Sequence, residues 1–256
     1  MNKRMELRKV LLPLALFTVA GAGFTTVATL QHQSAPPNNN QRSVEHAEFE
    51  AQFPIAEYSA AESADSYKRA KRQAKSKKYD NSLAPLSGSA ETILSSLHWE
   101  DGLSALPVDR SHAVVIGKVT GAEAYVSNDK TGVYSEFTVH LDEVLKNSSN
   151  VSLAPGSTVS VERAGGRVRL PSGQVALMYT RAQGMPRAGR RYVFFLSHDF
   201  PLQGRQDIDL YILTGYELRA GRIHALDSPH GHPITATKGK VENSFLEELR
   251  AAIANR

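Results

Sequence analysis

The sequence predicts a mainly β protein, a small antiparallel barrel or sandwich that ends in a C-terminal helix. From about residue 111 onward, runs rich in Val, Ile, Leu, Tyr and Phe are separated by glycine and proline turns about every 8–15 residues, a spacing typical of small all-β domains. Within this region Val133–Leu145 alternates apolar and polar residues, which is typical of a strand with one buried face. Ahead of the β region, we expect an N-terminal membrane or signal helix and a disordered to partly helical stalk.

The N-terminus predicts export from the cytoplasm. The segment Met1–Lys9 carries four basic residues, and Val10–Leu30 then has no charged residue, a pattern that the export machinery recognises. Residues 1–30 fit a transmembrane anchor, for which roughly 20 apolar residues suffice, or a signal peptide cleaved after Ala20-Gly21-Ala22; a buried soluble helix is a third alternative. An anchor predicts a single-pass protein of the cell membrane with its C-terminal domain outside the cytoplasm, whereas cleavage predicts a secreted or periplasmic protein.

Residues 31–81 are expected to form a disordered, charged linker. Gln31–Ser43 is rich in Gln, Asn and Pro, a composition typical of unstructured chain. Acidic residues then precede a run of seven cations in Lys68–Lys78, which predicts a solvated, partly helical stalk because this order of charges suits a helix dipole. The basic run is also a candidate for binding anionic lipid, cell-wall polymer or nucleic acid. Residues 82–110 are expected to lead into the barrel, with a short helix over Glu91–Leu97.

Residues 111–240 contain the predicted β-barrel domain. Its best hairpin pairs His112–Ser127 with Val133–Leu145 across the turn Asn128–Gly132. Further strands are predicted at Ser157–Arg163, Arg167–Leu170, Gln174–Tyr179, Arg191–Ser197, Leu210–Glu217 and Arg222–Leu226. Residues 241–256 are expected to be a C-terminal helix, because apolar residues recur at helical spacing over Asn243–Ala254.

Several strand and turn segments share a recognisable arrangement. They are Ala113–Val119, Tyr134–Val139, Asp142–Asn147, Pro155–Ser157, Gly189–Leu196 and Leu213–Tyr216. These segments resemble a group of uncharacterised exported bacterial proteins with a β-barrel domain, and more distantly they are similar to the OB-like barrels of netrin-type modules. The resemblance covers about residues 111–226 and implies an OB-like barrel. It implies no particular activity.

Composition and motifs narrow the classes of function. The chain has no cysteine, which excludes thiol catalysis and cysteine-based zinc sites. Its net charge is only +4, which argues against a strongly basic surface that would attract nucleic acid. It contains no P-loop, dinucleotide fingerprint, H-E-x-x-H motif or nucleophile elbow. We therefore expect a protein that is not an enzyme, needs no cofactor and binds no nucleic acid.

Arginines of the predicted barrel are the candidate ligand-binding residues. Arg167, Arg169, Arg187 and Arg190 lie on or beside predicted strands, and the face of an OB-like barrel commonly binds an extended polymer. Two alternatives remain open. These arginines form a cationic patch for an anionic ligand, or they are ordinary surface charge that discourages pairing between the strand edges of two molecules.

Three histidines near the end of the barrel define an alternative function. His224, His230 and His232 fall within nine residues, and zinc accepts three such ligands plus water at a catalytic site. They predict a metal-dependent hydrolase, unless they belong to an exposed loop without a metal. The sequence favours an extracytoplasmic, membrane-anchored, non-catalytic binding or assembly module. Its expected partners are the membrane, through the N-terminal helix, and an unknown envelope protein or anionic polymer.

Overall fold

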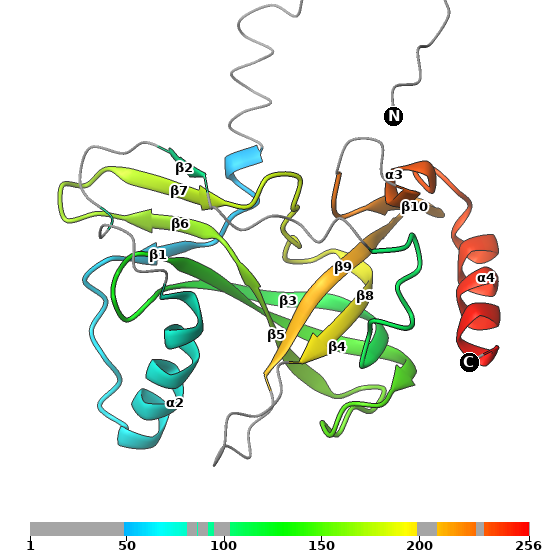
Figure 1. The fold of residues 1–256 in the computed structure, drawn as a ribbon, viewed down its shortest axis with the longest axis horizontal. Coiled ribbons are helices and arrows are strands. Elements are labelled where there is room, and N and C mark those ends of the chain that lie inside the picture. The colour runs from blue at the N-terminus through cyan, green and yellow to red at the C-terminus, as the bar shows by residue number, and fades with distance from the viewer. Residues whose placement is uncertain are drawn as a thin grey trace, which may run out of the picture. The chain divides into compact units, whose positions relative to one another are not determined.

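Five strands of the chain pair into a closed ring. The computed structural model describes residues 49–80, 86, 92–94, 103–198, 209–228 and 233–255. The five strands, shown in Figure 1, are β3 (Ala113–Val126), β4 (Val133–Asn147), β5 (Thr158–Ala164), β8 (Arg191–His198) and β9 (Leu210–Arg219). They pair in the order β3-β4-β5-β9-β8, and β8 returns to β3; every pair is antiparallel except β5–β9. With β10 (Arg222–Ala225) added beside β9, the predicted mainly β fold is confirmed.

A second sheet packs against the end of the β3–β4 hairpin that carries the turn. It contains β1 (Ile55–Glu57), β6 (Gly166–Arg169), β7 (Val175–Tyr179) and β2 (Thr92–Leu94), in the order β1-β6-β7-β2. Val168 and Met178 of this sheet share an apolar cluster with Ala124 and Val133 of the hairpin. The structure differs here from the short helix expected over Glu91–Leu97, because its central residues pair in parallel with β7.

The ring encloses an apolar core. On β4, Phe137, Val139 and Leu141 are fully buried and alternate with exposed residues, so the predicted period of two is confirmed. Two residues of the opposite face depart from the pattern: Tyr134 is buried and Glu136 is half-buried. They depart because a helix covers that part of the face.

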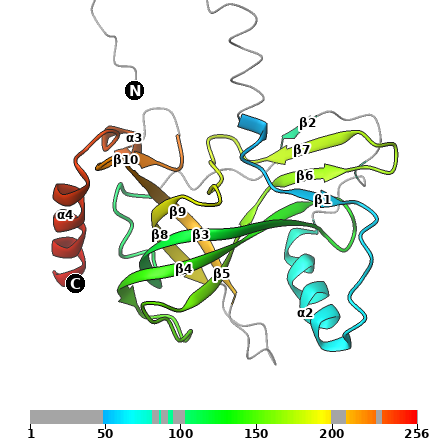
Figure 2. The same ribbon diagram turned by 180° about the vertical axis from the view of Figure 1, so that it is seen from behind.

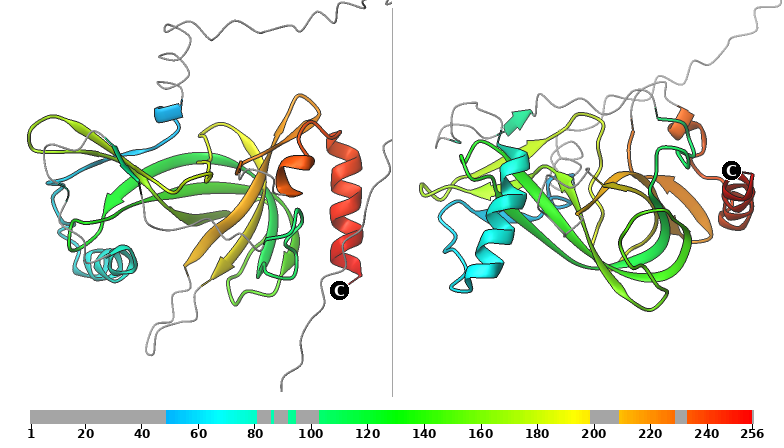
Figure 3. Two further views of the ribbon diagram at one scale, coloured as in Figure 1. Left: turned by 45° about the horizontal axis from the view of Figure 1, so that its top comes forward. Right: turned by 60° about the horizontal axis from the view of Figure 1, so that its bottom comes forward.

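Two longer helices lie at opposite ends of the described structure, as Figures 2 and 3 show. One is α2 (Ser66–Ser76), which continues into the short 3-10 helix η1 (Lys77–Tyr79). The other is α4 (Glu242–Ala254), which follows the single turn α3 (Pro233–Ala236) and confirms the predicted C-terminal helix. Phe245, Leu246 and Leu249 of α4 are buried in an apolar cluster with residues of β8, β9 and β10.

The N-terminal region departs from the sequence expectation where it is described. Residues 1–48 lie outside the described residues, so the leader and the first part of the linker remain predictions. Among the described residues, no helix is both long and apolar enough to cross a bilayer. Over residues 49–80 the structure differs from a solvated stalk, since Phe53 lies in the ring core, Ala56 is buried and α2 contacts the sheet. All described residues belong to one compact unit, Asn39–Arg256.

Candidate functional site

Helix α2 lies on the outer face of the ring and leaves an open groove beside it. The groove has a volume of about 1100 Å³. Its walls are α2, residues 56–63, residues 151–152 and the outer faces of β3, β4 and β5. Concave surfaces with converging polar groups are where ligands usually bind, so this groove is the candidate binding site.

The local sequence explains why α2 forms. Asp65 caps the helix, because its Oδ1 accepts hydrogen bonds from the backbone N–H groups of Tyr67 at 2.9 Å and Lys68 at 3.1 Å. The helix consists mostly of Ala, Lys, Arg and Gln, which are strong helix formers. Its buried residues are Lys75 and Ser76 rather than apolar ones. Polar contacts therefore hold α2 on the sheet.

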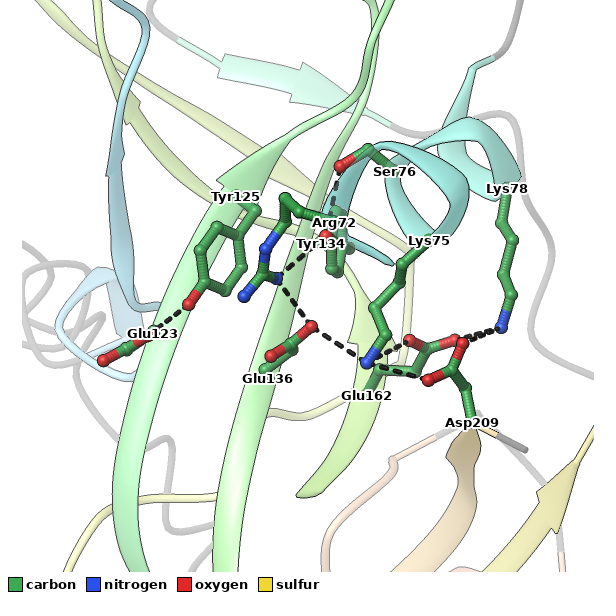
Figure 4. Close-up of polar contacts among 10 residues, drawn as sticks. All are labelled: Arg72, Lys75, Ser76, Lys78, Glu123, Tyr125, Tyr134, Glu136, Glu162 and Asp209. Carbon is green, nitrogen blue, oxygen red and sulfur yellow. Dashed lines mark hydrogen bonds and ion pairs between the residues drawn. The ribbon is translucent and has the colours of Figure 1, made fainter. Parts of the chain in front are cut away.

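Lys75 is at the centre of these contacts (Figure 4). Its Nζ lies 3.0 Å from Glu136 Oε1 on β4, 3.5 Å from Glu162 Oε2 on β5 and 3.0 Å from Asp209 Oδ1 just before β9. Glu136 and Glu162 are directly opposite each other across the β4–β5 pair. Like charges in such a pair repel, and the ammonium group between them offsets that repulsion.

Two further cations complete the cluster. Lys78 Nζ lies 2.9 Å from Glu162 Oε1 and 3.2 Å from Asp209 Oδ2. Arg72 Nη1 donates a hydrogen bond of 2.7 Å to Glu136 Oε1. Three cations of α2 and η1 thus face three carboxylates of the ring, and we call these six residues the ion-pair cluster. Buried ion pairs such as those of this cluster stay charged only when each charged group has an oppositely charged partner and hydrogen bonds.

Tyrosines of the hairpin fix the position of α2. The Arg72 guanidinium lies 3.3 Å above the Tyr125 ring, a cation–π arrangement. Tyr134 Oη accepts a hydrogen bond of 3.1 Å from Arg72 and lies 3.2 Å from Ser76 Oγ. The Tyr79 ring stacks on Tyr134 with a centroid distance of 4.3 Å. These contacts orient the guanidinium and place Lys75 over the carboxylates.

The β3–β4 turn supports the end of α2. Asn128 Nδ2 donates a hydrogen bond of 2.7 Å to the Gln73 carbonyl, and the Asp129 N–H donates one of 3.0 Å to Asp80 Oδ1. Gly132 lets the chain pass: a Cβ at this position would come within 2.2 Å of the Tyr79 carbonyl oxygen. The glycine of the predicted turn is therefore required by the docking of η1.

Burial and ion pairing oppose each other in the ion-pair cluster. Burial alone would lower the pKa of Lys75, but the carboxylates of Glu136, Glu162 and Asp209 outweigh it and raise that pKa. Burial opposes ionisation of Asp209, yet Lys75 and Lys78 lower its pKa. Burial raises the pKa of Glu162 in spite of the two lysines. The lysines therefore stay charged at neutral pH, and their ion pairs hold α2 and η1 on the ring.

The structure places Arg167 and Arg169 on β6, outside the walls of the groove. Arg167 Nε donates a hydrogen bond of 2.8 Å to the Phe53 carbonyl. Arg169 Nη1 lies 3.4 Å from Glu57 Oε1 on β1, and both side chains are more than half exposed. These two arginines therefore join β6 to the neighbouring β1 segment.

Arg187 and Arg190 lie in the segment before β8 and are also outside the walls of the groove. The Arg187 backbone N–H donates a hydrogen bond of 2.9 Å to Tyr192 Oη. Arg190 Nε lies 3.8 Å from Glu217 Oε1 on β9. Two of the four predicted arginines thus lie on β6, and the other two lie in the segment before β8.

Of the three predicted metal ligands, only His224, on β10, belongs to the described residues. His230 and His232 lie outside them. Asp227, in the same region, is fully buried and accepts hydrogen bonds of 2.8 Å from Arg163 Nη2 to both its oxygens. It also accepts one of 2.9 Å from the Gly184 N–H. The part of the chain that the structure describes holds no group of three or more His, Cys, Asp or Glu residues arranged to bind a metal.

The ion-pair cluster was not predicted from the sequence, although the spacing of its cations is visible there. Arg72, Lys75 and Lys78 are spaced by three residues, so they share one helix face. Glu136 and Glu162 lie on segments that were correctly predicted as strands. The register that pairs the two glutamates would have indicated a need for a cation. A comparison of the sequence with protein-family models and with curated proteins found no match.

Proposed function

We propose that this chain is a non-catalytic binding module, presented outside the cytoplasm by its N-terminal segment, and that the α2 groove is its binding surface. The observation that carries the proposal is the open groove of about 1100 Å³ on the ring face. Its walls present charged, tyrosine and hydroxyl side chains together with alanines and valines, while Phe137, Val139 and Leu141 of β4 belong to the ring core. A concave surface that combines apolar area with a few polar groups is typical of a ligand-binding site.

The strand order supports an OB-like barrel. The ring has five strands, with the long β3 and β4 followed by β5, and the chain then crosses to β8 and β9. In OB-like barrels the face of the second and third strands commonly binds an extended polymer. Here those strands are β4 and β5, and both contribute residues to the groove.

The charge states of two groove residues, Lys75 and Asp209, support binding rather than catalysis. A general base works best when its pKa is near the working pH. The carboxylates around Lys75 outweigh its burial and raise its pKa, and the two lysines beside Asp209 lower the pKa of that carboxyl group. Both groups therefore keep their charges across the physiological range.

Location outside the cytoplasm is tested by single-cysteine labelling, since the natural chain has no cysteine. Ser172 is exposed in the turn between β6 and β7, so the full chain carrying Ser172→Cys takes up a maleimide. We expect a membrane-impermeant maleimide to label this variant equally in intact and in lysed cells. Labelling only after lysis would contradict the proposed location.

Binding in the groove is tested with a second single-cysteine variant. Ser160 is exposed on β5 and belongs to the wall of the groove, whereas Ser172 does not. A photo-crosslinker on Ser160→Cys is expected to give adducts in cells that the same reagent on Ser172→Cys does not give. Identical adducts from both positions, or none from Ser160→Cys, would contradict the groove as a binding surface.

A further inference from the structure

The hairpin of β9 and β10 places two arginines side by side. Arg219 is the last residue of β9, Arg222 is the first residue of β10, and the two are directly opposite each other in the register. Both are exposed to solvent. Residues in such a position have Cβ atoms about 5 Å apart, and like charges there repel each other. The two guanidinium groups therefore form a local excess of positive charge.

The turn between the two arginines is tight, and the start of α4 holds it in place. Its central residues, Ala220 and Gly221, have φ angles of 52° and 70°, and positive φ at both positions is typical of a two-residue hairpin turn. The Gly221 carbonyl accepts a hydrogen bond of 2.9 Å from the Glu242 N–H. Arg222 Nη1 donates one of 2.7 Å to the Gly239 carbonyl. That bond orients the guanidinium group but leaves its charge and its other donors for a ligand.

Glu217 and Glu242 lie next to the hairpin, and each is paired with a different arginine. Glu217 is two residues before Arg219, so both point to the same face of β9, but Glu217 Oε1 lies 3.8 Å from Arg190 Nε. Glu242 Oε1 accepts a hydrogen bond of 3.0 Å from Arg191 Nη1. In the part of the chain that the structure describes, neither arginine of the hairpin has a carboxylate partner. An anion at the hairpin therefore meets two charges that no carboxylate balances.

We propose that Arg219 and Arg222 bind the phosphate group of a phosphate ester. A guanidinium group donates hydrogen bonds as a planar fork, which matches pairs of phosphate oxygens. A phosphate monoester carries close to two negative charges and three acceptor oxygens, enough for two guanidinium groups, whereas a carboxylate has one charge and two oxygens. Neither arginine belongs to the wall of the α2 groove. The hairpin is thus a second site, independent of the function proposed for the groove.

Protection from phenylglyoxal, which modifies exposed arginines, tests the site in the full-length chain purified in a non-ionic detergent. Mass spectrometry follows each arginine separately. At about pH 8, where a phosphate monoester is a dianion, we expect phenyl phosphate to slow modification of Arg219 and Arg222 in a saturable way and to leave the exposed Arg181 unaffected. Malonate, a dicarboxylate of equal charge, is expected to protect less. Equal or stronger protection by malonate, or equal protection of Arg181, would overturn the proposal.

The decisive variant is Arg219→Gln, and Arg181→Gln is its matched control, because Arg181 is exposed and lies outside the hairpin. Loss of one of the two guanidinium groups is expected to weaken the binding of phenyl phosphate, measured by protection of Arg222, about fivefold. The control should bind as the natural chain does. Removal of one of two like charges should not lower the midpoint of urea unfolding, so weaker binding would not reflect unfolding. Equal binding by Arg219→Gln and the control would contradict a site at this hairpin.

A second arm of the experiment identifies the source of the phosphate group. Phosphatidic acid, a phosphate monoester on a lipid, replaces phenyl phosphate in the detergent micelles at equal phosphate concentration. Protection by phosphatidic acid alone would assign the site to a membrane headgroup, and protection by phenyl phosphate alone would assign it to a soluble ester. Protection by both would show that the phosphate group itself is recognised, whereas protection by neither would reject the site.

Discussion

The two longer helices of the described unit are attached to the same ring mainly by different means. Helix α4 buries Phe245, Leu246 and Leu249 in an apolar cluster, and its ion pairs to the ring, from Glu242 and Arg250, are partly exposed. Helix α2 buries Lys75 and Ser76 and docks through ion pairs and tyrosine contacts. Apolar burial depends little on salt or pH, whereas ion pairing depends on both. The comparison therefore predicts a permanently packed helix at one end and a releasable helix at the other.

The largest effect is expected when α4 loses its central aromatic residue. Phe245 is fully buried, and its ring lies 4.8 Å from that of Tyr216. Phe245→Ala creates a cavity and should lower the free energy of unfolding by about 3–5 kcal/mol. Urea unfolding measures this loss, and Ala251→Gly, at an exposed position of the same helix, controls for a change in helix propensity, about 1 kcal/mol. Equal losses in the two variants would show that α4 does not depend on its apolar face.

A smaller loss of stability is expected when α2 loses its buried cation, Lys75. Lys75→Met leaves Glu136, Glu162 and Asp209 with fewer counter-charges, but release of α2 lets water reach them. We therefore expect a loss of about 1–3 kcal/mol in the free energy of unfolding, less than that from Phe245→Ala. Hydrogen exchange should become faster across residues 66–79 and stay unchanged across residues 242–254.

Lys77→Met is the matched control for that variant, because Lys77 is exposed in the same basic run. It should leave exchange in α2 close to that of the natural chain. If Lys77→Met loosened α2 as much as Lys75→Met, general charge rather than the ion-pair cluster would hold the helix.

The same contrast explains how much of the molecule could be predicted from its sequence. Strand β4 and helix α4 follow from local periodicity, as in β4, where Phe137, Val139 and Leu141 alternate with polar residues. The other strands from β3 to β10 follow from β-rich runs between glycine and proline turns. The apolar residues of α4 repeat at helical spacing and find a neighbouring sheet. Helices and strands that bury an apolar face can therefore be predicted from the spacing of apolar residues in the sequence.

Docking of α2 could not be predicted in the same way. Its partners Glu136 and Glu162 lie far along the chain and occupy the strand face that alternation assigns to solvent. Asp209 completes the cluster from the start of β9. A charged helix with few apolar residues has the composition of a solvated linker, and only the three-dimensional arrangement shows the carboxylates that receive it. Arg167 and Arg169 lie on β6, whereas Arg187 and Arg190 precede β8, because strand order, not sequence proximity, determines which residues share a face.

Added salt is expected to loosen α2 but not α4, and to do so less than either substitution loosens its helix. The side chains of Arg72 and Lys78 are partly exposed, 36% and 20%, so ions reach the edge of the cluster. Raising ionic strength from about 0.05 M to about 1 M shortens the screening length severalfold. Exchange in residues 66–79 should become a few-fold faster, while exchange in residues 242–254 should not. Equal acceleration in both helices would indicate a general effect of salt on the unit.

The smallest expected effect concerns one proton on Asp209. Lys75 and Lys78 hold its pKa below the ordinary value of 3.8, so the folded state binds this proton more weakly than the unfolded state does. The resulting stabilisation is present above pH 3.8 and is lost as the pH falls toward the folded-state pKa. Asp209→Asn removes the charge at every pH. Hydrogen exchange of α2 should therefore be faster in Asp209→Asn than in the natural chain at pH 6, and the gap should narrow as the pH falls below 3.8. A gap of constant size, or one that also appears in α4, would show that ionisation of Asp209 does not hold α2 on the ring.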